Sequence, residues 1–414
     1  VHYVRAVGKL EALEEKIAGQ ELGGTMGIAH TRWATHGGVT EENAHPHQDC
    51  KGNIFLVHNG IIENYAELRT KLQERKHRFT SQTDTETLVH LIEHLYRGSL
   101  EDAVRQALRF VRGAYGIAVI AKSEPDKIVV ARLSSPLVIS VNGDAAFVAS
   151  DPAALISHSN KMIFLDDKEM AVIQRGHYVV TDLRNNLRQK ETTELDWTIE
   201  EAQRGGHAHF MLKEIMEEPE AIENSMRGRL LLEEGNIKLG GLSAVEDRLR
   251  EIDHLILIAC GTAAHAARTG EYMLEEYGGI STEVDVGSEF RYRKPVLDKK
   301  TAVVCISQSG ETADTLASLR EIRQKGVLAL GITNVVGSTQ SRETDAGIYT
   351  RSGPEIAVAS TKAFVGQLTA LAMLTVYLGR RRDMAVVMGK RIVSELAKLP
   401  ELARQVLQQA PEIE

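Results

Sequence analysis

A first group of residues with chemical potential lies between positions 30 and 84. Arg32 carries a planar guanidinium that can clamp a carboxylate with two hydrogen bonds. Asn59 and Gly60 can offer a side-chain amide and an unobstructed backbone N–H to one oxyanion, although Asn-Gly is also a common hairpin turn. Asp84 stands where a helix should begin, so it is either a ligand for a positive group or an N-cap. The runs that contain these residues are 30–37 (HTRWATHG), 43–47 (NAHPH), 58–60 (HNG) and 82–86 (QTDTE).

The histidines of the His45-Pro46-His47 run do not have the helical or turn spacing of a dedicated zinc site. We therefore expect no metal at this run. That no metal or organic cofactor is needed elsewhere in the chain is implied by the family resemblance given below.

A second group follows two apolar runs in the latter half of the chain. Residues 259–263 (ACGTA) follow the first run, and residues 306–315 (ISQSGETADT) follow the second. The Ser-Gln-Ser-Gly-Glu-Thr loop supplies hydroxyls, an amide and backbone N–H groups at the start of a helix, which suits a phosphate dianion. The alternative is an ordinary helix cap. The loop matches neither a Walker motif nor a Gly-x-Gly-x-x-Gly fingerprint, so nucleotide binding is not indicated.

The elements that must position the first group are short strands and helices. Strands are predicted at 27–32, 54–58, 115–121, 127–131, 137–141, 145–149, 171–173 and 178–181. Helical periodicity is present only at 65–75 and 84–97. This pattern predicts sheets covered by helices, an α+β layered domain.

The second group is positioned by alternating strand–loop–helix units. Strands are predicted at 255–259, 302–306 and 327–333, and a charged helical stretch at 213–229 precedes them. Such units imply a parallel sheet with helices on both faces and binding loops at the carboxyl ends of the strands.

Composition limits the class of protein. The chain has 414 residues, 43% of them hydrophobic, which predicts at least two domains. Its net charge of -8 does not favour nucleic acid or an anionic membrane. The longest apolar run, 370–378, is too short to span a bilayer and is expected to be a core helix. Three scattered cysteines favour a reducing cytoplasm.

In this order, the first set of motifs resembles the glutaminase domain of class II amidotransferases. The resemblance implies an αββα sandwich in which a cysteine at the mature N-terminus attacks the glutamine amide, with its own α-amino group as the base. It implies an oxyanion hole made by Asn59 and Gly60. Glutamine would be held by Arg32, Thr35, His36, His45 and Asp84, with Trp33 gating the path of ammonia.

The second set, with 358–362 (VASTK), resembles the sugar isomerase domain, a flavodoxin-like α/β fold. The resemblance implies that the 6-phosphate binds to Ser307, Gln308, Ser309 and Thr312, and that the sugar is lined by Gly261, Thr262, Val358 and Ser360. Ala263 stands where that family usually has serine, which would weaken binding by about 0.5–1.5 kcal/mol.

Both sets on one chain resemble the aminotransferases that convert glutamine and fructose 6-phosphate to glutamate and glucosamine 6-phosphate. That resemblance implies ammonia passing between the two sites, and a cytoplasmic homodimer. The expected boundaries are 1–200 for the amidotransferase domain, 201–244 for a linker, 245–385 for the isomerase domain and 386–414 for a further helical linker.

Because the chain begins at Val1 and ends at Glu414, we expect it to lack both the N-terminal cysteine and a second isomerase domain. The printed chain is then not expected to hydrolyse glutamine. Two alternatives are a non-catalytic sugar-phosphate binding protein and an amino-sugar isomerase or deglycase. The glutaminase motifs argue against the latter.

Overall fold

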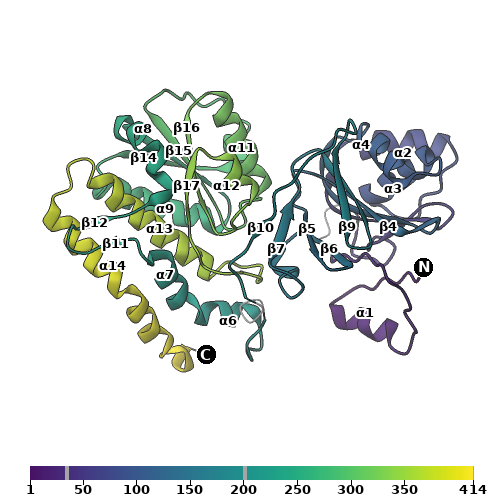
Figure 1. Cartoon of the computed structure of the whole chain (residues 1–414), viewed down its shortest axis with the longest axis horizontal. Helices are drawn as coiled ribbons and strands as arrows, with labels where there is room; N and C mark the ends of the chain where they lie inside the picture. The colour runs from purple at the N-terminus through teal and green to yellow at the C-terminus, as the bar shows by residue number, and fades with distance from the viewer. Residues whose placement is uncertain (33–36, 199–202, 414) are drawn as a thin grey trace. The chain divides into compact units, whose positions relative to one another are not determined.

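The computed structural model describes residues 1–32, 37–198 and 203–413. The chain divides into two compact units, Val1–Glu194 and Leu195–Glu414, called here the first and the second unit (Figure 1).

The first unit contains two antiparallel sheets packed face to face. Val130 and Ala171 of the larger sheet share an apolar cluster with Ile139 and Ile163 of the smaller one. The larger sheet has the order β1-β2-β3-β4-β8-β9, and the smaller has β10-β7-β5-β6. Their bounds are β1 (His47–Gln48), β2 (Ile54–Ile62), β3 (Gly113–Ala121), β4 (Glu124–Leu133), β5 (Val138–Asn142), β6 (Ala145–Ala149), β7 (Lys161–Phe164), β8 (Glu169–Gln174), β9 (His177–Asp182) and β10 (Thr193–Glu194).

Helices cover the outer face of the larger sheet. Leu88 and Ile92 of one helix pack on Leu56 and Ile117 of the strands below, in a single buried cluster. The described layers are therefore helix, sheet and sheet, which are three of the four layers of the predicted αββα sandwich. The covering helices are α2 (Tyr65–Glu74), α3 (Asp84–Leu95) and α4 (Leu100–Leu108), whereas α1 (Leu10–Ile17) and the short η1 (Pro152–Ala154) contribute little or nothing to this cluster.

Two expectations for the first unit were wrong. Residues 27–32 form no strand in the described part of the chain, where β2 pairs only with β3 and the two-residue β1. The helical content was also underestimated: α4 was not predicted, although Leu100, Val104 and Leu108 recur in it at four-residue spacing and Ser99 caps it. The strand predictions within β2–β6, β8 and β9 were confirmed.

The second unit is built on a parallel sheet with the order β14-β13-β15-β16-β17. Numbered along the chain this is 2-1-3-4-5, the flavodoxin-like order, so the predicted fold is confirmed. Leu255 and Leu257 of the central strand face one apolar cluster, while Ile256 and Ile258 face another, so both faces of the sheet are covered. The strands are β13 (His254–Ala259), β14 (Ser281–Val286), β15 (Thr301–Ser307), β16 (Leu328–Thr333) and β17 (Ala346–Tyr349), and a separate hairpin pairs β11 (Leu230–Leu231) with β12 (Asn236–Ile237).

Helices cover both faces of this sheet (Figure 1). One face carries α9 (Thr262–Glu276) and α13 (Lys362–Gly379), with α7 (Glu218–Met226) and α14 (Val386–Leu407) in the same cluster. The other carries α10 (Gly287–Phe290) and α11 (Ala313–Gln324). The remaining elements are α6 (Phe210–Met216), η2 (Gly240–Val245), α8 (Glu246–Glu251), α12 (Thr339–Glu343) and α15 (Ala410–Ile413).

The helix α13 is long and apolar enough to cross a membrane, but 78% of it is buried within the fold. It includes the apolar run 370–378, which was predicted to be a core helix, and that prediction is confirmed.

Candidate functional site

Asn59 and Gly60 lie inside β2, where the ladder with β3 continues to the pair Ile62 and Gly113. The hairpin alternative is therefore wrong. Gly60 has a φ of 141°, and a Cβ built on it would lie 2.2 Å from the carbonyl oxygen of Ala114. The Asn59 side chain is exposed. Position 60 thus requires glycine. The neighbouring Asn59 presents its side-chain amide to solvent.

Asp84 does not cap its helix. The N-cap of α3 is Thr83, whose hydroxyl accepts a hydrogen bond from the Glu86 N–H at 3.2 Å. Asp84 is the first residue of α3, and its carboxylate accepts the Ile62 N–H at 2.8 Å. This bond joins the start of α3 to the end of β2, at a residue two positions after Gly60. Only 4% of Asp84 is exposed, which makes its negative charge effective toward a cation.

Arg32 and His45 share the wall of one pocket, which residues 4–11 also line. The guanidinium of Arg32 donates to the carbonyl oxygens of Gly38 at 3.2 Å and Gly37 at 3.4 Å. These bonds orient the side chain at the pocket wall. The other predicted residues of this motif, Trp33, Thr35 and His36, lie outside the described residues.

Three histidines lie at this pocket: the half-buried His30 and the buried His45 line it, and the buried His47 lies beside His45. The rings of His30 and His45 are 4.3 Å apart, and His47 meets the His45 ring edge-on at 5.1 Å. Burial lowers the pKa of His30 and of His47 to about 4, and it lowers the pKa of His45 as well. Each ring is therefore neutral near pH 7. The ring of His47 is fixed by Thr83, whose hydroxyl lies 3.0 Å from its Nε2.

These histidines predict an acid-sensitive first unit. In the unfolded chain they bind protons below pH about 6.5, but in the folded chain His30 and His47 bind them only near pH 4. Their contribution to stability is thus complete above pH about 6.5 and is lost as the pH falls toward 4. Denaturant unfolding at several pH values should show this loss of stability. In His47→Gln, the free energy of unfolding should depend less steeply on pH. An unchanged slope in that variant would contradict the assignment.

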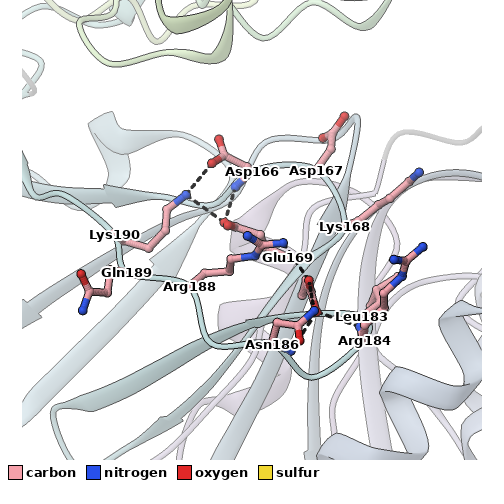
Figure 2. A pocket seen from close by; sticks show the side chains of 11 residues that line it. Asp166, Asp167, Lys168, Glu169, Leu183, Arg184, Asn186, Arg188, Gln189 and Lys190 are labelled. Atoms are coloured by element: carbon pink, nitrogen blue, oxygen red, sulfur yellow. Dashed lines mark hydrogen bonds and ion pairs between the residues drawn. The ribbon is translucent and has the colours of Figure 1, made fainter.

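A separate charged pocket lies over the ends of β8 and β9 (Figure 2). Lys190 donates to Asp166 at 2.7 Å and to Glu169 at 2.9 Å, while the Asp182 carboxylate accepts from Asn186 and Arg188. The charges neutralise one another, and no described residue of the predicted sites lines this pocket. We interpret it as a stabilised turn.

In the second unit, residues 307–312 form a loop between β15 and α11. Ser307 Oγ accepts the Gly310 N–H at 3.1 Å and lies 2.9 Å from Thr312 Oγ1, and Ser309 Oγ accepts the Glu311 N–H at 3.1 Å. Thr312 is the N-cap residue of α11, yet within the described chain its hydroxyl caps no N–H of that helix. The Thr312 side chain therefore does not cap the first N–H groups of α11, so the described loop is not the simple cap.

Gly261 and Thr262 follow the neighbouring strand β13 and lie at the same edge of the sheet as the loop after β15. Ala259 and Ile306 are paired in the parallel ladder, so the loops that follow β13 and β15 leave the sheet side by side. Gly261 has a φ of 58°, and Thr262 begins α9 with its side chain exposed. The order of the sheet reverses between these two strands, which is where ligands bind in open α/β sheets.

Val358 and Ser360 lie on the segment between β17 and α13. The Glu355 carboxylate organises this segment by accepting the Ser360 hydroxyl at 2.9 Å and the Thr361 N–H at 2.8 Å. Val358 is 87% exposed. Among the described residues, no hydrogen bond joins Val358 or Ser360 to the loop before α11, so their place at the sugar stays a prediction.

Two positioning residues were missed by sequence reasoning. Asn334 follows β16, donates its N–H to Gln308 at 3.1 Å and accepts the Ser352 N–H at 2.8 Å. Asn334 thereby connects the phosphate loop to the segment after β17. Glu355 is the second of these residues, because its carboxylate accepts hydrogen bonds from residues 360 and 361. The signal for Asn334 was its place directly after a buried parallel strand, as in the other two binding loops.

The family comparisons agree with this geometry. Residues 30–157 match the glutamine amidotransferase domain, and residues 248–377 match the SIS domain. Fold and sites thus define a glutamine amidotransferase domain followed by a sugar isomerase domain on one chain. The chain belongs to the family of glutamine–fructose-6-phosphate aminotransferases (isomerizing).

The relatives that show this family are similar over almost the whole chain. The aminotransferase of Chlorobaculum tepidum is 50% identical over 98% of this chain and 66% of its own length, and that of Thermus thermophilus is 47% identical over 99% and 67%. The chain thus spans about two thirds of these relatives. Among solved structures, the C-terminal domain of the Francisella tularensis enzyme is 36% identical, with a TM-score of 0.49, over 51% of this chain and 59% of that one.

Proposed function

We propose that the chain carries the glutamine site and the fructose 6-phosphate site of a glutamine-dependent aminotransferase that makes glucosamine 6-phosphate. The observation that carries the proposal is the presence of both motif sets on one chain, in the order of relatives that are 47% identical over 409 residues. Ammonia released at the first site would be used at the second.

The charges of the first unit complement those of free glutamine. Arg32, held by two loop carbonyls, would bind the α-carboxylate, and buried Asp84 would bind the α-ammonium group. Asn59 and the Gly60 N–H would stabilise the oxyanion formed when the side-chain amide is attacked. Binding roles for Thr35, His36 and His45, and a gating role for Trp33, belong to the same proposal.

The phosphate loop suits a dianion without any basic side chain. Ser307, Gln308, Ser309 and Thr312 surround the start of α11, and α9 begins at the end of the adjacent strand. Two helix N-termini at one sheet edge create a positive potential there. Gly261, Thr262, Val358 and Ser360 would contact the sugar.

A homodimer and a cytoplasmic location also belong to the proposal. The three free cysteines are consistent with a reducing compartment. Sedimentation of the purified protein tests the dimer, because a chain that sediments as a monomer at all concentrations would exclude it.

The test is calorimetric titration of the chain with L-glutamine and, separately, with fructose 6-phosphate. One site for each ligand is expected. Asp84→Asn keeps an oxygen for the Ile62 N–H but removes the charge, so it should weaken glutamine binding about tenfold or more and leave fructose 6-phosphate unaffected. Ser309→Ala should weaken fructose 6-phosphate binding and leave glutamine binding unaffected.

The outcomes separate the alternatives. Fructose 6-phosphate binding with no glutamine binding would support a non-catalytic sugar-phosphate binding protein. Binding of neither ligand would overturn the proposal, and so would an Asp84→Asn chain that binds glutamine as tightly as the parent.

A further inference from the structure

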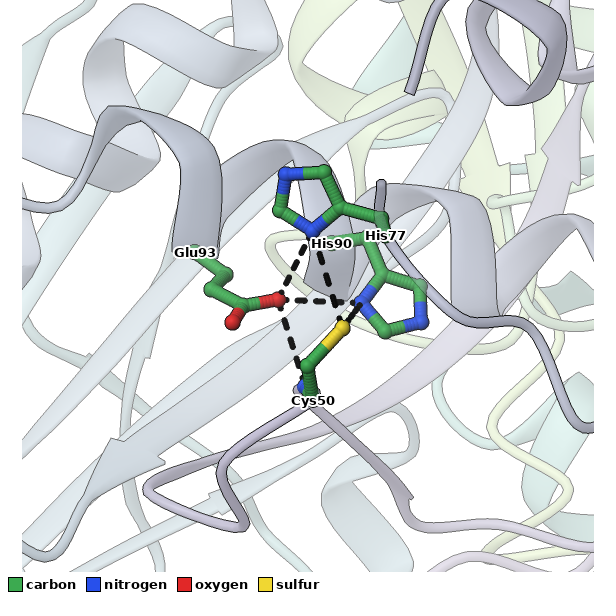
Figure 3. A group of neighbouring side chains, drawn as sticks. All are labelled: Cys50, His77, His90 and Glu93. Atoms are coloured by element: carbon green, nitrogen blue, oxygen red, sulfur yellow. Dashed lines mark hydrogen bonds and ion pairs between the residues drawn. The ribbon is translucent and has the colours of Figure 1, made fainter. Parts of the chain in front are cut away.

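Four side chains in the first unit direct their ligand atoms toward a common point (Figure 3). Cys50 lies in the turn before β2, and His77 follows α2. His90 and Glu93 lie on α3, three residues apart, and therefore project from one face of that helix. The Cys50 Sγ, the two histidine Nδ1 atoms and one Glu93 oxygen all lie within 4.8 Å of one another.

The separations match those around a tetrahedral metal ion. Cys50 Sγ is 3.7 Å from His77 Nδ1 and 3.5 Å from His90 Nδ1. Glu93 Oε2 is 2.9 Å from His77 Nδ1 and 3.1 Å from His90 Nδ1. Zinc bonds are about 2.3 Å to sulfur and about 2.0 Å to nitrogen and oxygen. In a tetrahedron with these bonds, sulfur lies about 3.5 Å from each nitrogen, and nitrogen lies about 3.3 Å from oxygen.

The surrounding backbone holds the ligands in place. Asp49 fixes the turn that carries Cys50, because its carboxylate accepts the N–H groups of Asn53 at 2.6 Å and Ile54 at 3.0 Å. His77 ends the turn after α2, where its N–H donates to the Leu72 carbonyl at 3.0 Å. The turns that carry Cys50 and His77 are thus each held by backbone hydrogen bonds.

Outer contacts of the kind found around metal ligands are also present. The Arg78 N–H donates to Cys50 Sγ at 3.4 Å, and the Cys50 N–H donates to Glu93 Oε2 at 3.2 Å. The second ring nitrogen of His90 lies 3.8 Å from the Glu86 carboxylate, an electrostatic contact that is longer than a hydrogen bond. A negative charge on that side favours coordination through the opposite nitrogen.

We propose that Cys50, His77, His90 and Glu93 bind one Zn²⁺ ion. Four protein ligands would leave no open position, so the ion is structural and not catalytic. It would fasten the turn before β2 to α2 and α3, and α3 begins with Asp84. His90 is only 1% exposed, whereas Cys50 is exposed and gives the ion a path from solvent. This inference does not depend on the proposed function.

This site was not predicted from the sequence, in which only the histidines near residue 45 were weighed as metal ligands. The signal for it is His90-x-x-Glu93 on a predicted helix. Cys50 and His77 were too distant along the chain to be joined to that pair.

The experiment is titration of the chelator-treated full chain with Co²⁺, followed by absorption. One Co²⁺ per chain is expected, with a thiolate-to-cobalt charge-transfer band and strong tetrahedral d–d bands, and Zn²⁺ should displace it. Cys50→Ser should abolish the charge-transfer band, and His90→Gln should weaken Co²⁺ binding by more than about tenfold. Zn²⁺ should raise the Tm of the parent but not that of Cys50→Ser.

Cys260→Ser is the matched cysteine control and should bind Co²⁺ as the parent does. His45→Gln should also bind normally, which excludes the histidines near residue 45 as the ligands. A parent chain that binds no Co²⁺ in stoichiometric amount would overturn the proposal, because the four side chains would then be joined only by hydrogen bonds. The same conclusion would follow if Cys50→Ser kept the parent spectrum.

Discussion

Gly60→Ala should destabilise the first unit strongly and abolish its glutamine binding. The φ of 141° is strained for alanine, which costs about 1–3 kcal/mol by itself. The added Cβ would also lie 2.2 Å from the Ala114 carbonyl oxygen, a backbone atom, so the β2–β3 ladder must open. Thermal unfolding followed by circular dichroism should show a Tm lower by at least about 2–4 °C per kcal/mol lost.

Gly143→Ala is the matched control for this substitution. Gly143 lies between β5 and β6 of the same unit, also has a positive φ, of 58°, and has nothing within 4 Å of the position of a Cβ. It should show only the cost of the backbone conformation, about 1–2 kcal/mol, and should bind glutamine normally. If both variants lost the same stability, the close contact with Ala114 would have no effect and the prediction would fail.

Gly310→Ala should weaken fructose 6-phosphate binding to the second unit. Gly310 has a φ of 66°, and a Cβ there would lie 2.2 Å from Ser338 Oγ and 2.8 Å from Thr333 Cγ2. Ser338 is fully buried, so the loop must move instead. Each hydrogen bond to a charged group contributes about 1.5–3 kcal/mol, so losing even one should weaken phosphate binding roughly tenfold to hundredfold in calorimetry.

The second unit offers a control and a rescue. Gly326→Ala carries the same kind of strain, with a φ of 71°, but meets nothing within 4 Å and should bind the sugar phosphate normally. Ser338→Gly, combined with Gly310→Ala, removes the crowded hydroxyl and should restore part of the affinity. Unchanged binding by Gly310→Ala alone would mean that the loop does not contact phosphate.

Local sequence predicted most of the strands and the place where two polar loops of the second unit leave the sheet. An apolar run such as 54–58 or 302–306 forms a strand because its own side chains favour burial, and polar residues that directly follow a parallel strand must emerge at the edge of the sheet. The order 2-1-3-4-5 then brings the loops after β13 and β15 together. For these features the partners are close in sequence or are dictated by the topology.

Features that depend on distant partners were decided by the tertiary structure. Asn59-Gly60 is a turn signal by itself, but the pairing of Ile62 with Gly113 extends β2 through it. Asp84 has the type and position of an N-cap, but Thr83 is the N-cap residue. The Asp84 carboxylate instead accepts a hydrogen bond from the Ile62 N–H. The group around Cys50 is formed by residues up to 43 positions apart. A pattern along the chain records only near neighbours, whereas these contacts depend on which side chain the folded backbone brings within hydrogen-bonding distance.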